Sequence, residues 1–313
     1  MAANKNLGRA RQNKNDEFYT QLTDIEKELR HYKEHFKGKR IFCNCDDPEF
    51  SNFWRYFELN FDHLGLQSLT STHYNETTAT YRLDMFRDEA GNVVSSRTTL
   101  EQNGDFRSPE PIAILDASDI VVTNPPFSLF REYVALLIEK EKHFIIIGSM
   151  NAVTYKETFN LIKENKMWLG NTSGGMTFEV PNKEEYANKS GFFKKDGRAY
   201  SKLGNISWYT NLDIAKRHED LLTWREYNKD DYPSYDNYDI INVNKIVDIP
   251  ADYDGLMGVP ITYFSMYNPS QFEVVGLANS ARWLGEVECY TIIDGKKIYN
   301  RVIIKRRSDL GDN

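Results

Sequence analysis

The chain has 313 residues, of which 40% are hydrophobic and 27% charged, a composition typical of a soluble globular protein. This length can bury a full core, and we expect one large domain plus a smaller one. No apolar stretch approaches the roughly 20 residues that span a bilayer, and the polar amino terminus is unlike a signal peptide. We therefore expect a cytoplasmic protein with its three cysteines, Cys43, Cys45 and Cys289, reduced.

The formal net charge of −7 argues against a protein that simply coats nucleic acid. It does not exclude local binding to DNA, because the affinity for DNA depends on the charge of the face that contacts the phosphates. Each end of the chain has a basic cluster, which is either a solvated surface or a DNA contact. The clusters are Lys5, Arg9, Arg11 and Lys14, and Lys296, Lys297, Arg301, Lys305, Arg306 and Arg307.

The first hundred residues predict alternating helices and strands. Residues 1–15 are polar and predict a flexible tail. Thr23 and Glu26 have the spacing of a capping box, which predicts a helix that ends near Gly38. Further elements are expected in chain order: a strand within 39–48, a helix that begins near Ser51, a strand at 67–72, and a hairpin or insertion at 77–100 with a turn at 91–92.

The most informative stretch is 119–127, with the sequence Asp-Ile-Val-Val-Thr-Asn-Pro-Pro-Phe. Its β-branched residues predict a fully buried strand of a parallel sheet. The strand must stop at Asn124, because the two prolines that follow cannot donate to a ladder and hold the backbone extended. A helix is predicted from about Ser128, with apolar residues at helical spacing. Such a polar turn lies at the carboxyl edge of an α/β sheet, where ligands bind.

The chemistry of this turn suits an exocyclic amine, such as N6 of adenine, whose lone pair is delocalised into the ring. Two acceptors on its N–H groups would draw the nitrogen towards tetrahedral geometry and free the lone pair. We expect the side-chain oxygen of Asn124 and the carbonyl of Pro125 to be these acceptors, since Pro126 holds the backbone stiff. Phe127 would stack on the base, so that the rate comes from positioning.

The second half of the chain predicts more strands than helices. Residues 182–205 are rich in Lys, Gly and Asn and predict a long exposed loop that faces DNA. The texture changes at about 214, where short strands and turns begin. Expected elements are strands at 143–148 and 167–170, a helix at 155–165, an antiparallel pair at 174–181 and 206–212, strands at 240–245, 258–264 and 302–305, and a hairpin turn at 294–295.

Taken together, the chain resembles the EcoRI-type adenine-specific DNA methyltransferases. The similarity weakens at 73–103, at 171–205 and after 276. The residues that carry it are 16–20 with 24–26, 43–48 with 51–53, 104–108, 119–133, 160–165, 235–238, 241–245 and 258–262.

The resemblance implies methyl transfer from S-adenosylmethionine (SAM) to N6 of an adenine that flips out of duplex DNA, within or derived from a restriction-modification system. Asn124, Pro125, Pro126 and Phe127 form its NPPF catalytic motif. The exit from the first strand lacks the glycines usual in SAM sites, so the short polar Ser51 and Asn52 would do their work. The implied cofactor-binding residues are Tyr19, Thr20, Cys45, Asp46, Ser51, Asn52, Phe53, Asp105, Phe106 and Asn124, with Glu76 as a candidate for the SAM ribose.

The resemblance also implies the fold class, an α/β protein with a Rossmann-like sheet that is mostly parallel with an antiparallel edge hairpin, flanked by helices. A smaller mixed region would recognise DNA. The expected divisions are the tail 1–15, a catalytic domain at 16–213 and a target-recognition region at 214–313. We expect double-stranded DNA as the partner, a monomer, no metal and no membrane.

Several alternatives share these residues. Protein-glutamine methyltransferases use a similar Asn-Pro-Pro block, and RNA is another possible substrate. Methyltransferases that act on N4 of cytosine usually have Ser in place of the leading Asn. A DNA-binding relative without turnover is an alternative from a different class, favoured only by the glycine-free turn. The sequence reveals neither the target site nor a cognate nuclease.

Overall fold

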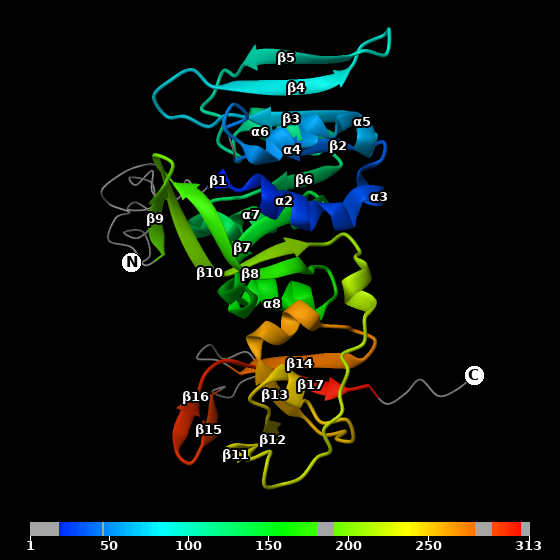
Figure 1. The fold of residues 1–313 in the computed structure, drawn as a ribbon, viewed down its shortest axis with the longest axis vertical. Coiled ribbons are helices and arrows are strands. Elements are labelled where there is room, and N and C mark those ends of the chain that lie inside the picture. Colours follow the sequence, from blue (N-terminus) through cyan, green and yellow to red (C-terminus); the bar gives the residue numbers. More distant parts are fainter. Residues whose placement is uncertain (1–18, 46, 181–190, 279–289, 308–313) are drawn as a thin grey trace, which may run out of the picture. The chain divides into compact units, whose positions relative to one another are not determined.

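The computed structural model describes residues 19–45, 47–180, 191–278 and 290–307 (Figure 1). Contacts divide the chain into two compact units. Unit 1 contains residues 1–149 and 172–212, and unit 2 contains residues 150–171 and 213–313. The passage into unit 2 at 213 lies where the sequence changes texture, but 150–171 also cluster with unit 2. The roles expected for 1–15, 16–213 and 214–313 stay predictions.

Unit 1 is built on a large mixed sheet. Among the described residues this sheet has ten strands, in the order β1-β8-β10-β7-β6-β2-β3-β4-β5, with β9 paired to β10. The pairs β7–β6, β6–β2 and β2–β3 are parallel, while β10 and β4 join this parallel core in antiparallel fashion. The strands are β1 Tyr19–Thr20, β2 Arg40–Cys43, β3 Ser68–Thr72, β4 Tyr81–Arg87, β5 Val93–Thr99, β6 Ile120–Thr123, β7 His143–Ser149, β8 Trp168–Val180, β9 Phe192–Lys195 and β10 Arg198–Thr210.

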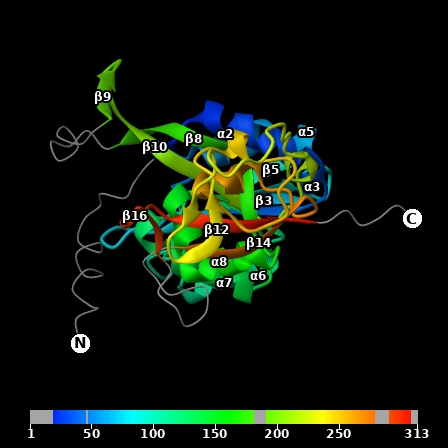
Figure 2. The same ribbon diagram turned by 90° about the horizontal axis from the view of Figure 1, so that it is seen from below.

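Helices cover both faces of this sheet. Figure 2 shows α2, α3 and α5 on one side, and α6 and α7 on the other. The α/β class predicted from the sequence is therefore confirmed, but the sheet is mixed and not mostly parallel, because the pairs β1–β8, β10–β7, β9–β10, β3–β4 and β4–β5 are antiparallel. The strands near 39–48, 67–72, 120–123 and 143–148 and the hairpin at 77–100 are also confirmed. The helices are α2 Leu22–Leu29, α3 Lys33–Phe36, α4 Asn52–Leu59, α5 Phe61–Leu64, α6 Pro109–Ala117 and α7 Phe130–Glu139, with 3-10 turns η1 Arg30–Tyr32 and η2 Phe127–Leu129.

The predicted capping box is wrong. Helix α2 begins at Leu22, and its N-cap is Gln21, whose side chain makes no capping hydrogen bond. The backbone carbonyl of Gln21 instead accepts from the N–H groups of Asp24 and Ile25. The helix starts early because β1 ends at Thr20, and Thr23 therefore lies inside the first turn.

Two predictions for the second half also fail. The strands expected at 167–170 and 174–181 are one strand, β8, because its neighbours in the sheet hold it extended through the polar stretch between them. The loop expected at 182–205 is a β9–β10 hairpin from Phe192 onwards, while 182–190 lie outside the described residues. Local composition favoured a loop, but cross-strand pairing determined the structure.

Unit 2 holds a five-stranded sheet of its described residues, ordered β11-β12-β13-β17-β14, and a two-stranded β15–β16 hairpin. The hairpin turn at Asp294 and Gly295 is confirmed, since both residues have positive φ. The strand predicted at 258–264 ends at Pro260 and continues as η6. The elements are α8 Lys156–Lys163, η3 Met150–Thr154, η4 Ala215–His218, η5 Ile246–Asp248, η6 Ile261–Met266, β11 Ser234–Tyr235, β12 Tyr238–Asn242, β13 Met257–Pro260, β14 Phe272–Ala278, β15 Thr291–Ile293, β16 Lys296–Ile298 and β17 Arg301–Arg306.

Half of the basic cluster near the carboxyl end serves the fold of unit 2. Arg306 donates to the carbonyl of Pro250, at 2.8 Å, and its guanidinium lies over the ring of Phe272. Arg301 and Arg307 likewise donate to groups within the unit, the side chain of Asn242 and the carbonyl of Pro269. Part of the cluster is therefore structural.

None of the described helices is long and apolar enough to cross a membrane.

A buried carboxylate joins α2 to the sheet of unit 1. Glu28 accepts from the hydroxyl of Tyr32 at 2.8 Å and from the N–H and hydroxyl of Thr172 at 2.6 and 2.7 Å. We expect Glu28→Ala to lower the free energy of unfolding by about 2–4 kcal/mol, because buried donors then lack their acceptor. Urea unfolding measures this, with Glu26→Ala on the exposed side of α2 as the control. Equal effects of the two changes would contradict the assignment.

Candidate active site

The candidate site lies at one edge of the sheet of unit 1. Strands β2, β3 and β6 run parallel, so their carboxyl ends meet at that edge. The segments that follow them begin at Asn44, His73 and Asn124. The Asn-Pro-Pro-Phe turn is therefore next to the exit from the first strand, as the sequence predicts.

The turn after β6 is deeply set. Asn124 is 8% exposed and Pro125 is buried, while Pro126 and Phe127 are half-buried. The ring of Phe127 stands perpendicular to that of Phe178 on β8, with centroids 6.4 Å apart. Phe178 is fully buried, as expected for a core residue, and it also supports the side chain predicted to stack on a base.

Asn44, which the sequence analysis did not select, joins the parts of this edge. Its backbone carbonyl accepts from the hydroxyl of Thr123, the last residue of β6. Its side-chain oxygen accepts from the hydroxyl of Tyr133 on α7. Asn44 is 1% exposed, and its Nδ2 is buried without a hydrogen-bond partner among the described residues.

Two further features stabilise this edge: a hydrogen bond between β3 and β2, and the protonated hydroxyl of the buried Tyr133. Ser71 at the end of β3 donates to the carbonyl of Cys43 at 2.6 Å, so β2 is held on both sides. Burial raises the pKa of Tyr133 well above its usual value, which keeps the hydroxyl protonated as a donor. In the sequence Tyr133 is part of the apolar stripe of a helix, and nothing there indicates its polar contact.

The glycine-free segment after β2 takes its left-handed backbone conformation at Cys45. Its φ of 68° lies in the left-handed region, which a side chain makes costly by about 1–2 kcal/mol. Ser51 instead caps α4, where its hydroxyl accepts from the N–H groups of Phe53 and Trp54 at 3.1 and 3.5 Å. The left-handed residue of this segment is therefore Cys45, and the part expected of Ser51 and Asn52 at the cofactor stays a prediction. Asp46 lies outside the described residues.

The other residues of the predicted cofactor site surround the start of α4. The amide of Asn52 donates to the carbonyl of Thr20 at 2.7 Å, which ties β1 to the helix. Tyr19 and Thr20 in turn pair with Glu179 and Phe178 of β8. Phe53 is buried against Trp208 of β10, with ring centroids 6.0 Å apart.

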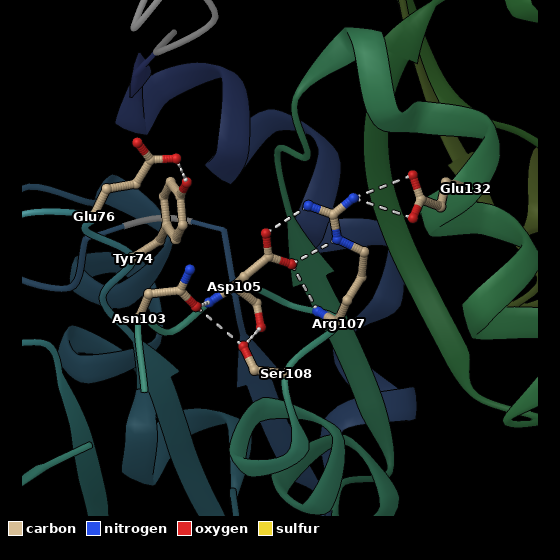
Figure 3. A network of polar contacts seen from close by, with 7 residues as sticks. All are labelled: Tyr74, Glu76, Asn103, Asp105, Arg107, Ser108 and Glu132. Atoms are coloured by element: carbon tan, nitrogen blue, oxygen red, sulfur yellow. Dashed lines mark hydrogen bonds and ion pairs between the residues drawn. The ribbon is translucent and has the colours of Figure 1, made fainter. Parts of the chain in front are cut away.

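Asp105 and Phe106 are connected to the helix that follows the Asn-Pro-Pro-Phe turn. Figure 3 shows Arg107 between two carboxylates. Its Nε and Nη2 donate to the two oxygens of Asp105 at 2.8 and 2.6 Å, and Nη1 donates to Glu132 on α7 at 3.2 Å. The hydrogen bond to Asp105 raises the pKa of Arg107. Phe106 is buried, and its ring stands perpendicular to that of Tyr133, 5.0 Å away.

Acidic residues after β2 and β3 take different partners. Asp47, which the sequence analysis did not assign, accepts from the hydroxyl of Tyr81 at 2.6 Å and lies 3.4 Å from His73. Glu76 is exposed and accepts from the hydroxyl of Tyr74 at 2.7 Å (Figure 3). Partial burial, with help from this hydrogen bond, raises the pKa of Tyr74 to about 12. Among the described residues, no three His, Cys, Asp or Glu side chains form a group that could hold a metal ion.

Comparison with known proteins identifies the class. The family model described as "Adenine-specific methyltransferase EcoRI" matches residues 6–307. The chain therefore belongs to the EcoRI family of adenine-specific methyltransferases, which confirms the resemblance seen in the sequence.

Individual relatives match over nearly their full length. The type II methyltransferase M.EcoRI of Escherichia coli is 46% identical over 98% of both chains. M.MpnI of Mycoplasma pneumoniae is 41% identical over 97% of this chain and 99% of its own. M.MgeORF184P of Mycoplasma genitalium is 40% identical over 96% and 98%. No solved structure matches the chain.

The hydrogen bond from Tyr133 to Asn44 can be tested by removing the hydroxyl that donates it. We expect Tyr133→Phe to lower the free energy of unfolding by about 1–2 kcal/mol, because the buried oxygen of Asn44 loses its hydrogen bond. Methylation should also slow, since the hydroxyl holds α7 against the segment beside Asn124. Urea unfolding and a methyl-transfer assay measure both effects. Tyr299→Phe, at a side chain that is 91% exposed, is the control and should change neither.

The left-handed turn gives a second prediction. Cys45→Gly should leave stability within about 1 kcal/mol, because relief of strain offsets the greater freedom of the unfolded chain. Cys45→Val should cost about 2 kcal/mol or more, since a β-branched residue is a severe outlier at positive φ. Thermal unfolding measures both. Cys43→Val in strand β2 is the control, and a comparable loss there would show that added bulk, not the backbone, is responsible.

Proposed function

We propose that this protein transfers a methyl group from SAM to N6 of a specific adenine in duplex DNA. The observation that carries the proposal is the buried Asn124-Pro125 turn beside Phe127, at the edge where β2 and β6 end. We further infer that the parallel core β7-β6-β2-β3 is a Rossmann-like SAM-binding sheet. Residues 214–313 would then read the target sequence.

The residues around Asn44 and Cys45 suit SAM. The left-handed backbone at Cys45 lets the chain pass close to a ligand, and α4 presents its amino-terminal end nearby. The buried Nδ2 of Asn44 offers a donor there. Candidate holders are Tyr19, Thr20, Cys45, Asp46, Ser51, Asn52, Phe53, Asp105, Phe106 and Asn124. When bound, SAM supplies an electrophilic methyl group on a sulfonium.

The catalytic turn acts by holding the target amine. A stacked adenine cannot reach the edge of the sheet, so the base must flip out of the duplex. The side-chain oxygen of Asn124 and the carbonyl of Pro125 accept from the two N–H groups, while Phe127 stacks on the ring. Phe178 supports Phe127, and the joint at Asn44 keeps this turn in place against the exit from β2. We expect a monomer that needs no metal, acting in or derived from a restriction-modification system.

The direct test is to incubate the protein with unmethylated plasmid and labelled SAM, then to digest the DNA to nucleosides and identify them by mass spectrometry. N6-methyladenine is the expected product, and its positions give the target sequence. SAM binding without a modified base would redirect the search to RNA or to a protein amide. Absence of SAM binding would leave a DNA-binding relative without turnover.

Asn124→Ala tests the role of the acceptor. We expect methylation to fall by about a thousandfold or more, because a preorganised polar contact to the reacting group is lost. The affinity for DNA and the melting temperature serve as controls for folding and should change little. Retained turnover would refute the role of Asn124.

A further inference from the structure

The β9–β10 hairpin extends the sheet of unit 1 beyond its neighbours. In both Figure 1 and Figure 2 it projects from the rest of the sheet. Its tip is a two-residue turn at Asp196 and Gly197, with φ values of 50° and 75°. Such a turn matches the natural twist of two antiparallel strands and gives the hairpin a defined shape.

One face of this hairpin gathers cations around an aromatic pair. Residues directly opposite each other in an antiparallel pair share a face. Phe193 is opposite Tyr200, and their rings are stacked with centroids 5.4 Å apart. Lys195 is opposite Arg198 on the same face, and Lys202 follows Tyr200 at the alternating position. We call Lys195, Arg198 and Lys202, with the stacked pair, the cationic face.

The opposite face has a different role. Ala199 is buried there with Val180, and Phe192 packs against them. This small apolar cluster ties the hairpin to the end of β8. The cationic face is therefore not needed to cover the core.

The charges of the cationic face are available to a partner. Lys195 and Lys202 are exposed and form no ion pair with another described residue. Arg198 lies 3.2 Å from Glu179, but its side chain remains 67% exposed. Residues 192–202 contain four cations and one acid, in a chain whose net charge is −7. An acidic protein that concentrates cations on one projecting face is suited to a polyanion.

The turn end of the hairpin, at Arg198, contacts β8 next to a residue of the candidate active site. Glu179, which pairs with Arg198, follows Phe178 directly on β8. Phe178 contacts Phe127, the residue proposed to stack on the flipped adenine. A duplex that delivers a base to this site therefore passes close to the hairpin.

We infer that the cationic face binds the phosphate backbone of the duplex whose adenine enters the active site. The inference rests on the proposed function. Phosphate contacts of this kind set the position of a protein on DNA and contribute affinity without reading sequence. The stacked rings of Phe193 and Tyr200 pack between β9 and β10, the two strands that carry these cations.

The test measures affinity for a short labelled duplex, centred on a position that the plasmid experiment shows to be methylated, at several salt concentrations. In Lys195→Gln/Lys202→Gln the slope of log affinity against log salt should fall in magnitude by about 1.8, since each phosphate contact contributes about 0.9. Affinity at about 50 mM salt should weaken roughly tenfold or more. KM for DNA should rise, whereas kcat at saturating DNA and SAM affinity should stay unchanged.

Matched variants separate charge from structure. Lys195→Arg/Lys202→Arg retains both cations and should keep the slope of the natural protein. Lys33→Gln/Lys37→Gln removes the same charge from exposed positions at the start and the C-cap of α3, a helix that Figure 1 shows far from β9 in the same unit, and should also keep the slope.

The outcomes distinguish the two proposals. An unchanged slope in the hairpin variant, with methylation intact, would overturn the inference and leave the proposed function standing. An equal fall in the α3 variant would also overturn it, because the effect would then be one of net charge. A natural protein that binds no duplex would refute the proposed function itself.

Discussion

The candidate site depends on the contacts of Asn44. This buried residue receives hydrogen bonds from Thr123 at the end of β6 and from Tyr133 on α7. The end of β6 and helix α7, which flank the Asn-Pro-Pro-Phe turn, are thus both held by the residue that follows the neighbouring strand β2. Hydrogen bonds inside a protein are costly to leave unmade, so the arrangement tolerates little displacement. A reaction that depends on positioning an amine requires this kind of rigidity.

The remaining contacts around the site have the same effect. Arg107 links Asp105 to Glu132 on α7, and Phe106 packs on Tyr133. The segment expected to bind SAM is therefore connected to the helix that follows the Asn-Pro-Pro-Phe turn. In the proposed mechanism, the residues that bind SAM and those that bind the adenine are held by the same contacts, which would fix the distance between the methyl donor and the amine that receives it.

The sequence predicted most of what depends on local chemistry. The strand at 120–123 and the turn after it were predictable because β-branched residues and consecutive prolines restrict the backbone directly. The helix start at Leu22 and the hairpin from Phe192 were not, because pairing with β8 and β10 outweighs local preference there. Asn44 and Asp47 were missed for a related reason: their partners, Tyr133 and Tyr81, are distant in sequence, and a tyrosine in an apolar stripe does not reveal where its hydroxyl points.

Charge distribution then relates the fold to DNA. A net charge of −7 disfavours indiscriminate binding, so contact with phosphates must come from a few placed cations. Near the carboxyl end, Arg301, Arg306 and Arg307 donate hydrogen bonds within unit 2, whereas the cations of the β9–β10 hairpin are exposed beside the candidate active site. Phosphate contacts position a protein and base contacts specify its site. If the hairpin makes the phosphate contacts and unit 2 makes the base contacts, affinity and sequence preference reside in different parts of the chain. Each can then change while the chemistry proposed at Asn124 is retained.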